Sequence, residues 1–420
     1  MKKRVALITH EMSLVGGLPT LINFLHRTLI ESGRYESELI SLATSASDAA
    51  SLQLKSPATW LRPPRIDSLA WHDLTFTHVG VWGSELEFQR YRPRRRLTEL
   101  LKRYDLLQFV VGSPPWVCVA EDVDRPILVW TATTTRADRA SQMRNGSITR
   151  RTWSSWMVPI AERYELRALK AAAAIFALSE YTRAAIEPIV GADKVLLAPC
   201  GVDTDLFRPA ANPTGNYILW VGRLSDARKN VRLVLEAYAM LRKTVEDLPD
   251  LYLVGDHLPN PDVAFLRSQQ LENKVRVIER RGPEELAELY RNARFFVLSS
   301  DEEGLGIVIL EAMASGLAVV STNCGGPATA ITEGKTGLLI PIGDAKALAQ
   351  AMEKLLLNPP LRQRMGMEGR RVAEERFSVA AAGKIFLDTY DKLLRGSEQA
   401  VTDPHFENCV STIPASTTET

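Results

Sequence analysis

Short apolar runs alternate with amphipathic stretches along most of the chain, and this alternation predicts repeated strand–helix units. Residues 4–10, RVALITH, predict a short buried strand, and the apolar positions of residues 21–32 recur at helical spacing. A loop that contains glycines lies between them. A strand, a glycine-containing loop and a helix in this order are typical of the first unit of a doubly wound α/β domain.

The same alternation continues in both halves of the chain, on either side of a Pro-, Ala- and Asn-rich stretch at 208–216 that is typical of a linker. Further strands are predicted at 105–111, 125–132, 172–180, 217–224, 250–256, 294–300 and 317–322, and helices at 181–190, 231–245, 283–293 and 343–358. Residues 44–95 show no clear order, and residues after about 397 are polar and predict a loose tail. The pattern predicts two α/β domains of similar size that face each other across a cleft.

Composition limits the function classes. The chain has 420 residues, of which 45% are hydrophobic and 24% are charged, which is typical of folded soluble proteins. A net charge of +1 gives no overall basic field, so we expect no nucleic-acid partner. The four cysteines are far apart without a CxxC pair, which disfavours a zinc site or a disulfide framework, and no metal is expected. The apolar run after the N-terminal basic residues is too short for a signal peptide, so we expect a cytoplasmic protein.

Residues 299–316, SSDEEGLGIVILEAMASG, carry the clearest candidate chemistry. Glu303 and Glu311 have seven residues between them and lead into an apolar helix, where an unpaired carboxylate is costly. The backbone N–H groups of residues 304–306 lie at the start of that helix, where they can bind hydroxyls or anionic oxygens. We expect Glu311 about two turns into the helix and on the same side as Glu303. Two hypotheses follow: the acids hold a sugar joined to a ribose, or one caps the helix and the other faces water.

Two phosphate-binding motifs are close but do not match. Residues 304–309, GLGIVI, begin like the dinucleotide fingerprint, but Ile309 stands where the third glycine is needed for close helix packing. Residues 333–337, EGKTG, contain GKT without a glycine at the required distance upstream. A nicotinamide-dependent dehydrogenase is therefore disfavoured.

Residues 301–341 resemble the retaining glycosyltransferases of family 4, which have a GT-B fold of two Rossmann-like doubly wound domains and an E-x7-E motif. The resemblance implies that Glu303 lies against the donor sugar as the catalytic acidic residue and that Glu311 holds the ribose of the nucleotide. It also implies that the amides of Gly304, Leu305 and Gly306 contact the sugar.

Two further segments extend this resemblance. Residues 217–230, YILWVGRLSDARKN, are similar to the segment whose Arg and Lys hold the donor diphosphate, which implies Arg223 and Lys229, with Arg228 as a rival for the second role. Two cations there would neutralise the leaving nucleoside diphosphate. Residues 15–20, VGGLPT, resemble the glycine loop of the first domain, so Gly16 and Gly17 are assigned to donor binding.

The resemblance also implies the division of the chain. The expected parts are an acceptor-binding domain at 1–207, a nucleotide-sugar-binding domain at 208–375, a closing helix at 376–396 that crosses back to the first domain, and a disordered tail at 397–420. No cofactor is expected, because the UDP- or GDP-linked donor is a substrate.

One departure from the family pattern concerns the N-terminal domain. Many members carry a His at the end of the strand that corresponds to 125–132, and this chain has Thr131 and a run of threonines there. A front-face retaining mechanism does not require a protein base, because the leaving phosphate can take the acceptor proton. The sequence thus predicts a retaining glycosyltransferase acting in glycan or glycolipid synthesis. The alternatives are a sugar-nucleotide epimerase or phosphorylase-like enzyme on the same fold, and a non-catalytic nucleotide-sugar-binding partner of a transferase.

Residues 90–104, RYRPRRRLTELLKRY, contain seven cations and one acid. Leu97, Leu101 and Tyr104 follow helical spacing, which predicts a helix with an apolar face and basic borders. Two hypotheses follow. In the first, the helix packs on the first domain and its basic rim is solvated. In the second, the rim contacts anionic lipid head groups or a lipid-linked acceptor. The second hypothesis places the protein on the inner face of the membrane without a spanning segment.

Overall fold

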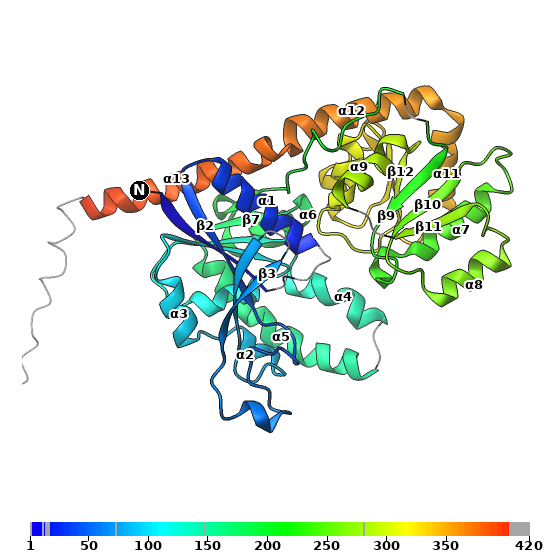
Figure 1. The fold of residues 1–420 in the computed structure, drawn as a ribbon. Coiled ribbons are helices and arrows are strands. Elements are labelled where there is room, and N and C mark those ends of the chain that lie inside the picture. The colour runs from blue at the N-terminus through cyan, green and yellow to red at the C-terminus, as the bar shows by residue number, and fades with distance from the viewer. Residues whose placement is uncertain are drawn as a thin grey trace, which may run out of the picture.

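The structure is a computed structural model that describes residues 2–10, 12, 17–71, 74–145, 148–212, 214–279 and 282–402. The described residues form two α/β units, each built on one twisted sheet (Figure 1). The two-domain α/β prediction is therefore confirmed.

The first sheet contains, among the described residues, eight strands in the order β3-β4-β2-β1-β5-β6-β7-β8. Its strands are β1 (Lys3–Thr9), β2 (Tyr35–Leu42), β3 (Ile66–Trp71), β4 (Leu74–Val79), β5 (Leu106–Val111), β6 (Ile127–Thr131), β7 (Ala174–Ala177) and β8 (Val195–Leu197). The pairs are parallel except for β3 and β4, which form an antiparallel edge. The helices of this unit are α1 (Gly17–Glu31), α2 (Glu87–Arg90), α3 (Arg95–Leu101), α4 (Thr135–Asn145), α5 (Ile148–Ala171) and α6 (Glu180–Val190).

The second sheet is parallel, with six strands in the described chain in the order β11-β10-β9-β12-β13-β14. Its strands are β9 (Tyr217–Val221), β10 (Asp250–Gly255), β11 (Val275–Glu279), β12 (Phe296–Leu298), β13 (Val319–Thr322) and β14 (Gly337–Ile340). Its helices are α7 (Val231–Leu241), α8 (Asn260–Ser268), α9 (Pro283–Asn292), α10 (Ile307–Ala314), α11 (Ala345–Leu357) and α12 (Pro359–Phe377).

The predicted strands and helices form where the apolar patterns placed them, and the differences have local causes. Residues 44–95, for which no order was predicted, contain β3 and β4 at the exposed edge of the sheet, where one-sided burial weakens the apolar signal. Within residues 90–104 only Arg95–Leu101 form a helix, α3, and Arg90 is the last residue of α2, because Pro93 between them interrupts the helix. The last helix, α13 (Val379–Thr402), continues past the predicted end at residue 396.

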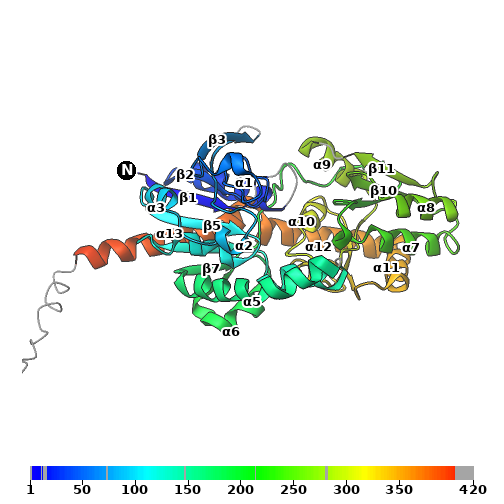
Figure 2. The same ribbon diagram turned by 90° about the horizontal axis from the view of Figure 1, so that it is seen from below.

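The helix α13 crosses from the second unit onto the first, and Figures 1 and 2 show α12 and α13 spanning both units on one side of the molecule. Phe386 is fully buried, with its ring centroid 4.7 Å from that of Trp130 and 4.4 Å from that of Phe176. One turn later, the buried Tyr390 hydroxyl donates to Gln108 Oε1 over 2.8 Å. The C-terminal helix thus completes the core of the N-terminal unit.

The two units also meet beside the C-terminal ends of their strands. The backbone N–H of Glu180, at the start of α6, donates to the Thr329 hydroxyl over 3.0 Å. A Cβ at Gly304 would lie 3.2 Å from the Ala132 Cβ, so the glycine turn before α10 packs directly against the end of β6. Within the described ranges, no helix is long and apolar enough to cross a bilayer.

We expect the Phe386→Ala variant to lose about 3–5 kcal/mol of unfolding free energy, because it leaves a cavity between the crossing helix and the first sheet. Lys384→Ala, on the exposed side of the same helix, is the matched control and should change stability by no more than about 0.5 kcal/mol. Chemical denaturation followed by tryptophan fluorescence measures both variants. Equal stability of the two variants would contradict the role of α13 in the first core.

Candidate functional site

Three loops meet at one edge of the second sheet, where the parallel strands β9, β12 and β13 end side by side. They are residues 222–230, 299–306 and 323–329. Ligands of open parallel sheets bind outside the carboxyl ends of the strands. Most of the residues predicted for donor binding lie on the first two of these loops.

Glu303 is held by contacts with both neighbouring loop segments. Lys229 Nζ lies 2.6 Å from Glu303 Oε1, and the two side chains are only 20% and 10% exposed. The Ser300 hydroxyl donates to the same oxygen over 2.8 Å. Behind this pair, the Ser299 hydroxyl donates to the Lys229 carbonyl over 3.1 Å and accepts from Trp220 Nε1 over 3.0 Å. The structure therefore brings together two of the predicted site residues, Lys229 and Glu303.

The backbone around Glu303 is also fixed. Its carbonyl accepts from the Gly326 N–H over 3.1 Å, and Glu303 forms a parallel bridge with Gly325. Burial and the negative charge of Glu303 raise the pKa of the neighbouring Cys324 thiol to about 12, so this thiol stays protonated. The third loop thus packs against the backbone of Glu303. Nothing in the sequence indicated that Ser300 and Cys324 would be neighbours of this carboxylate.

The arginines of the first loop share one carboxylate, that of Asp226. Arg223 Nη2 lies 2.7 Å from Asp226 Oδ2, and Arg228 reaches the same carboxylate with Nη2 at 2.9 Å and Nε at 3.1 Å. Burial raises the pKa of Asp226, but the bonds and charges of Arg228 and Arg223 outweigh it and hold this pKa below its ordinary value. The hydrogen bond and charge of Asp226 raise the pKa of Arg228, and the charges of Asp138 on α4 and of Glu302 raise it further. Sequence reasoning missed Asp226.

Glu311 is the fifth residue of α10, and its carboxylate contacts a different partner from that of Glu303. The helix begins at Ile307, so Glu311 stands just over one turn into it, whereas the sequence predicted two turns. The Tyr290 hydroxyl donates to Glu311 Oε2 over 2.9 Å. Burial raises the pKa of Tyr290, and the Glu311 carboxylate raises it further. Glu311 is thus anchored by α9, although its side chain is only partly buried.

The glycine turn forms the start of α10. Gly306 has φ +84° and ψ +68°, a left-handed conformation that favours glycine, and no side chain caps the N–H groups of the first turn. Leu305 is buried in the core, with only 1% of the residue exposed. These uncapped N–H groups are suited to donate hydrogen bonds to ligand oxygens.

In the first unit, Gly17 begins α1, while Gly16 lies outside the described residues. At the end of β1, His10 stacks on Trp116 with ring centroids 4.7 Å apart, and its Nε2 accepts from the Gly112 N–H over 3.1 Å. Burial lowers the pKa of His10 to about 4, so the ring is neutral. Thr131, which stands where the family pattern has a His, is buried and its hydroxyl lies 2.9 Å from the Thr133 carbonyl.

Comparison with known proteins agrees with this geometry. Residues 202–372 match the family model described as Glycosyl transferases group 1. The D-inositol 3-phosphate glycosyltransferase of Corynebacterium diphtheriae is 34% identical over 239 residues, which cover 50% of this chain and 56% of that protein. The chain spans about half the length of the curated relatives it matches. The match to the group 1 model thus lies mainly in the second unit.

Solved structures extend the likeness to the whole fold. Sucrose-phosphate synthase from Thermosynechococcus elongatus aligns with a TM-score of 0.71 at 21% identity, covering 94% of this chain and 100% of that chain. Alr3699/HepE from Anabaena, in complex with UDP and glucose, aligns with a TM-score of 0.67 at 17% identity, covering 93% and 100%. The predicted GT-B fold is therefore confirmed.

The neutral His10 predicts a specific acid sensitivity. The unfolded chain binds a proton on this residue between about pH 6.5 and 4, and the folded protein does not, so stability should fall as the pH decreases through this window. The slope from one such group is at most about 1.4 kcal/mol per pH unit. Urea unfolding at several pH values should show a weaker pH dependence for His10→Gln, which keeps an acceptor for the Gly112 N–H.

The exposed His257 offers the control, because His257→Gln should keep the wild-type pH dependence. If His10→Gln and His257→Gln respond to acid alike, the neutral state of His10 is wrong.

Proposed function

We propose that this protein is a retaining glycosyltransferase that moves a sugar from a UDP- or GDP-linked donor to an acceptor held by the first unit. The observation that carries the proposal is the ion pair of Lys229 and Glu303, which lies at the carboxyl edge of a sheet within the segment that matches the group 1 model. The names of the curated relatives support a glycosyltransferase. The UDP bound to the structurally similar HepE supports a nucleoside diphosphate donor.

The first loop supplies the charge for the diphosphate. Arg223 and Arg228 are each about 40% exposed, so their guanidinium groups reach solvent although both contact Asp226. With Lys229 they place three cations within seven consecutive residues. Charge-assisted hydrogen bonds from these groups stabilise the nucleoside diphosphate as it leaves.

The acids bind the hydroxyls. Both recorded hydrogen bonds to the Glu303 carboxylate end on Oε1, so among the described residues Oε2 receives none and is available to a sugar hydroxyl. The N–H groups at the start of α10 lie beside this carboxylate in the chain and contact the same sugar. Glu311, oriented by Tyr290, accepts from the ribose.

The transfer step uses the leaving group as the base. As the bond between the sugar and the diphosphate breaks, the acceptor hydroxyl attacks from the same face and its proton passes to the departing phosphate oxygen. The cations neutralise the charge that builds up there. Closure of the two units around the reacting groups excludes water.

A second candidate function is a non-catalytic nucleotide-sugar-binding partner of a transferase. The observation in its favour is Thr131, whose hydroxyl is directed to backbone carbonyls where the family pattern has a sugar-contacting His. Incubation with a panel of UDP- and GDP-sugars without acceptor separates the two. Slow release of free sugar supports the enzyme, and binding without any release across the panel supports the partner.

A cytoplasmic location and a membrane contact through residues 90–104 remain predictions. The side chains of Arg90 and Arg94 do not belong to a solvated rim, because they donate to backbone carbonyls at Ser84 and Gly80. Burial lowers the pKa of Arg94 to about 10. Any contact with lipid phosphates must therefore use the other cations of this segment.

We expect Glu311→Ala to weaken nucleotide binding and Glu303→Ala mainly to lower turnover. Loss of a hydrogen bond with a charged partner costs roughly 1.5–3 kcal/mol, which corresponds to about 10- to 150-fold. Titration calorimetry with UDP and GDP, and initial rates on the preferred donor, measure the two effects. Glu311→Gln should keep the hydrogen bond from Tyr290 and should therefore lose less nucleotide affinity than Glu311→Ala.

The exposed Glu272 provides the control, because Glu272→Ala removes an acid from the same unit away from the site. Wild-type turnover and donor affinity in both Glu303→Ala and Glu311→Ala would show that the two-acid site is wrong.

We expect Arg223→Ala and Lys229→Ala to weaken the binding of a nucleoside diphosphate by about tenfold or more and that of the free nucleoside little, since both act on the phosphates. Arg228→Ala tests the rival assignment in the same assay. Calorimetry with UDP and uridine, or GDP and guanosine, measures the ratio. Equal losses for the diphosphate and the nucleoside would contradict a phosphate contact.

A further inference from the structure

The chain between β2 and β4 forms a lobe, residues 43–71, that projects from the first unit on the side away from α13 (Figure 1). Leu61 at its tip is 95% exposed, and Trp60 beside it is 56% exposed. Large apolar side chains with exposed surface are frequent in the segment 60–82 and comprise Trp60, Leu61, Ile66, Leu69 and Trp82. Single exposed apolar residues are ordinary, but such a concentration marks an interaction surface.

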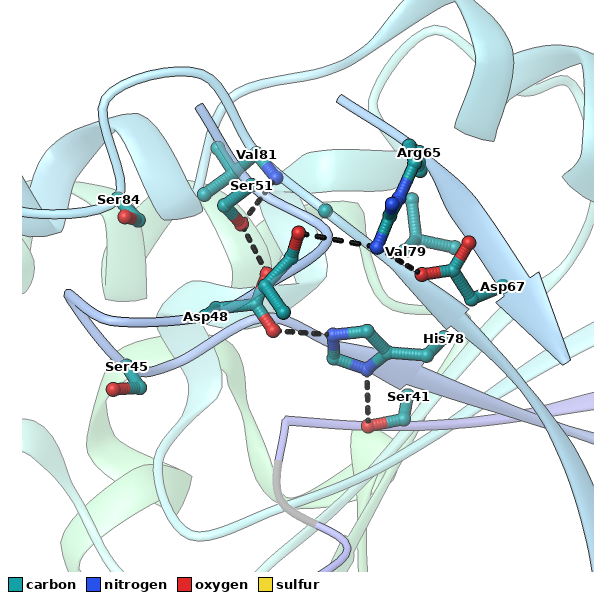
Figure 3. A network of polar contacts seen from close by, with 12 residues as sticks. Ser41, Ser45, Asp48, Ser51, Arg65, Asp67, His78, Val79, Val81 and Ser84 are labelled. Atoms are coloured by element: carbon teal, nitrogen blue, oxygen red, sulfur yellow. Dashed lines mark hydrogen bonds and ion pairs between the residues drawn. The ribbon is translucent and has the colours of Figure 1, made fainter. Parts of the chain in front are cut away.

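The lobe is held in place at its base. Figure 3 shows the His78 ring between Asp48 and Ser41, with Nε2 2.8 Å from Asp48 Oδ1. The Ser51 hydroxyl donates to the same Asp48 carboxylate and accepts from the Val81 N–H over 2.9 Å. This network joins the start of the lobe to the end of β4.

The tip is held as well. Arg65 Nη2 donates to the Ala49 carbonyl over 3.3 Å, and Trp60 Nε1 donates to the Gln53 carbonyl over 2.9 Å. The indole N–H is therefore satisfied inside the lobe while the ring remains exposed. Trp60 and Leu61 are therefore exposed although hydrogen bonds hold the chain around them.

Exposed cations lie on the lobe and on the segment beside it. Arg96 Nη1 donates to the Pro64 carbonyl over 3.3 Å, which places the start of α3 beside the lobe. Arg62, Arg92, Arg95 and Arg96 are all exposed, and in the described part of the chain none of them forms an ion pair. These charges are thus not neutralised within the described residues, and Arg62 and Arg96 lie on or beside the lobe.

We propose that the tip of the lobe and these arginines form a docking surface for an anionic lipid bilayer. Trp60 and Leu61 enter the boundary between head groups and acyl chains, and the arginines contact lipid phosphates. The shape favours a bilayer over a small ligand, because the tip projects whereas small-molecule sites are concave. The proposed surface combines the tip of the lobe with Arg92, Arg95 and Arg96 of the segment 90–104. Its binding to lipid does not depend on sugar transfer.

Vesicle co-sedimentation of the full chain tests the proposal. The wild type should bind vesicles of phosphatidylcholine and phosphatidylglycerol (7:3) and detach as salt rises, with little binding to phosphatidylcholine alone. Leu61→Ser should bind about tenfold more weakly, because the buried leucine surface is lost. Vesicle affinity should fall about fivefold per arginine, or on the order of 100-fold in all, in the variant that combines Arg62→Gln, Arg95→Gln and Arg96→Gln.

Two exposed positions of the second unit serve as matched controls, Leu357→Ser for the apolar change and Arg267→Gln for the charge change, and both should bind as the wild type. Thermal unfolding confirms that each variant is folded. Wild-type binding by Leu61→Ser, or an unchanged salt dependence in the triple variant, would overturn the proposal. Absence of binding to the anionic vesicles would do so as well, and would leave a protein partner as the occupant of the lobe.

Discussion

The ion pair between Lys229 and Glu303 is the interaction on which the second unit's ligand-facing edge depends. Both side chains are largely withdrawn from water, with 2.6 Å between their charged atoms. Removal of either partner from such a pair leaves an uncompensated charge in a poorly solvated place, which is far more costly than loss of a surface ion pair. Because Lys229 follows β9 and Glu303 follows β12, the pair holds together loops that are separate in sequence.

Further hydrogen bonds join the same two loops. The Asp301 N–H donates to the Arg228 carbonyl over 2.7 Å, and Asn230 Nδ2 donates to Asp301 Oδ1 over 2.9 Å. Asn230 adopts a left-handed conformation with φ +43°, which lets its side chain cap α7 through the Leu233 N–H. The cations are thus oriented by contacts within the fold. Under the proposed function, a diphosphate replaces carboxylate partners at cations that are already oriented, so little reorganisation is needed at the moment of reaction.

The sequence predicted the strands and the helix-entering loop well, because both signals are local. Buried strands such as β5 and β6 are apolar apart from Gln108 and the terminal Thr131, and the glycines around Leu305 mark a turn into a helix. The partners of the site residues were not predictable in this way. Tyr290 lies 21 residues before Glu311 on another helix, and Asp226 becomes the partner of both arginines only through the fold of its loop. Arg94 looked like part of a basic rim, but its role as a donor to the end of β4 depends on how α3 packs.

The two glycines of the turn are glycine for different physical reasons. Gly306 needs its left-handed backbone to start α10, and a side chain there would also lie 2.9 Å from the Ile309 side chain. Gly304 has no such backbone requirement, but a Cβ would press on Ala132 at the end of β6 and separate the two units. One turn therefore specifies both where the helix starts and how closely the first unit approaches. Glu303, the residue just before Gly304, therefore stands where the two units meet.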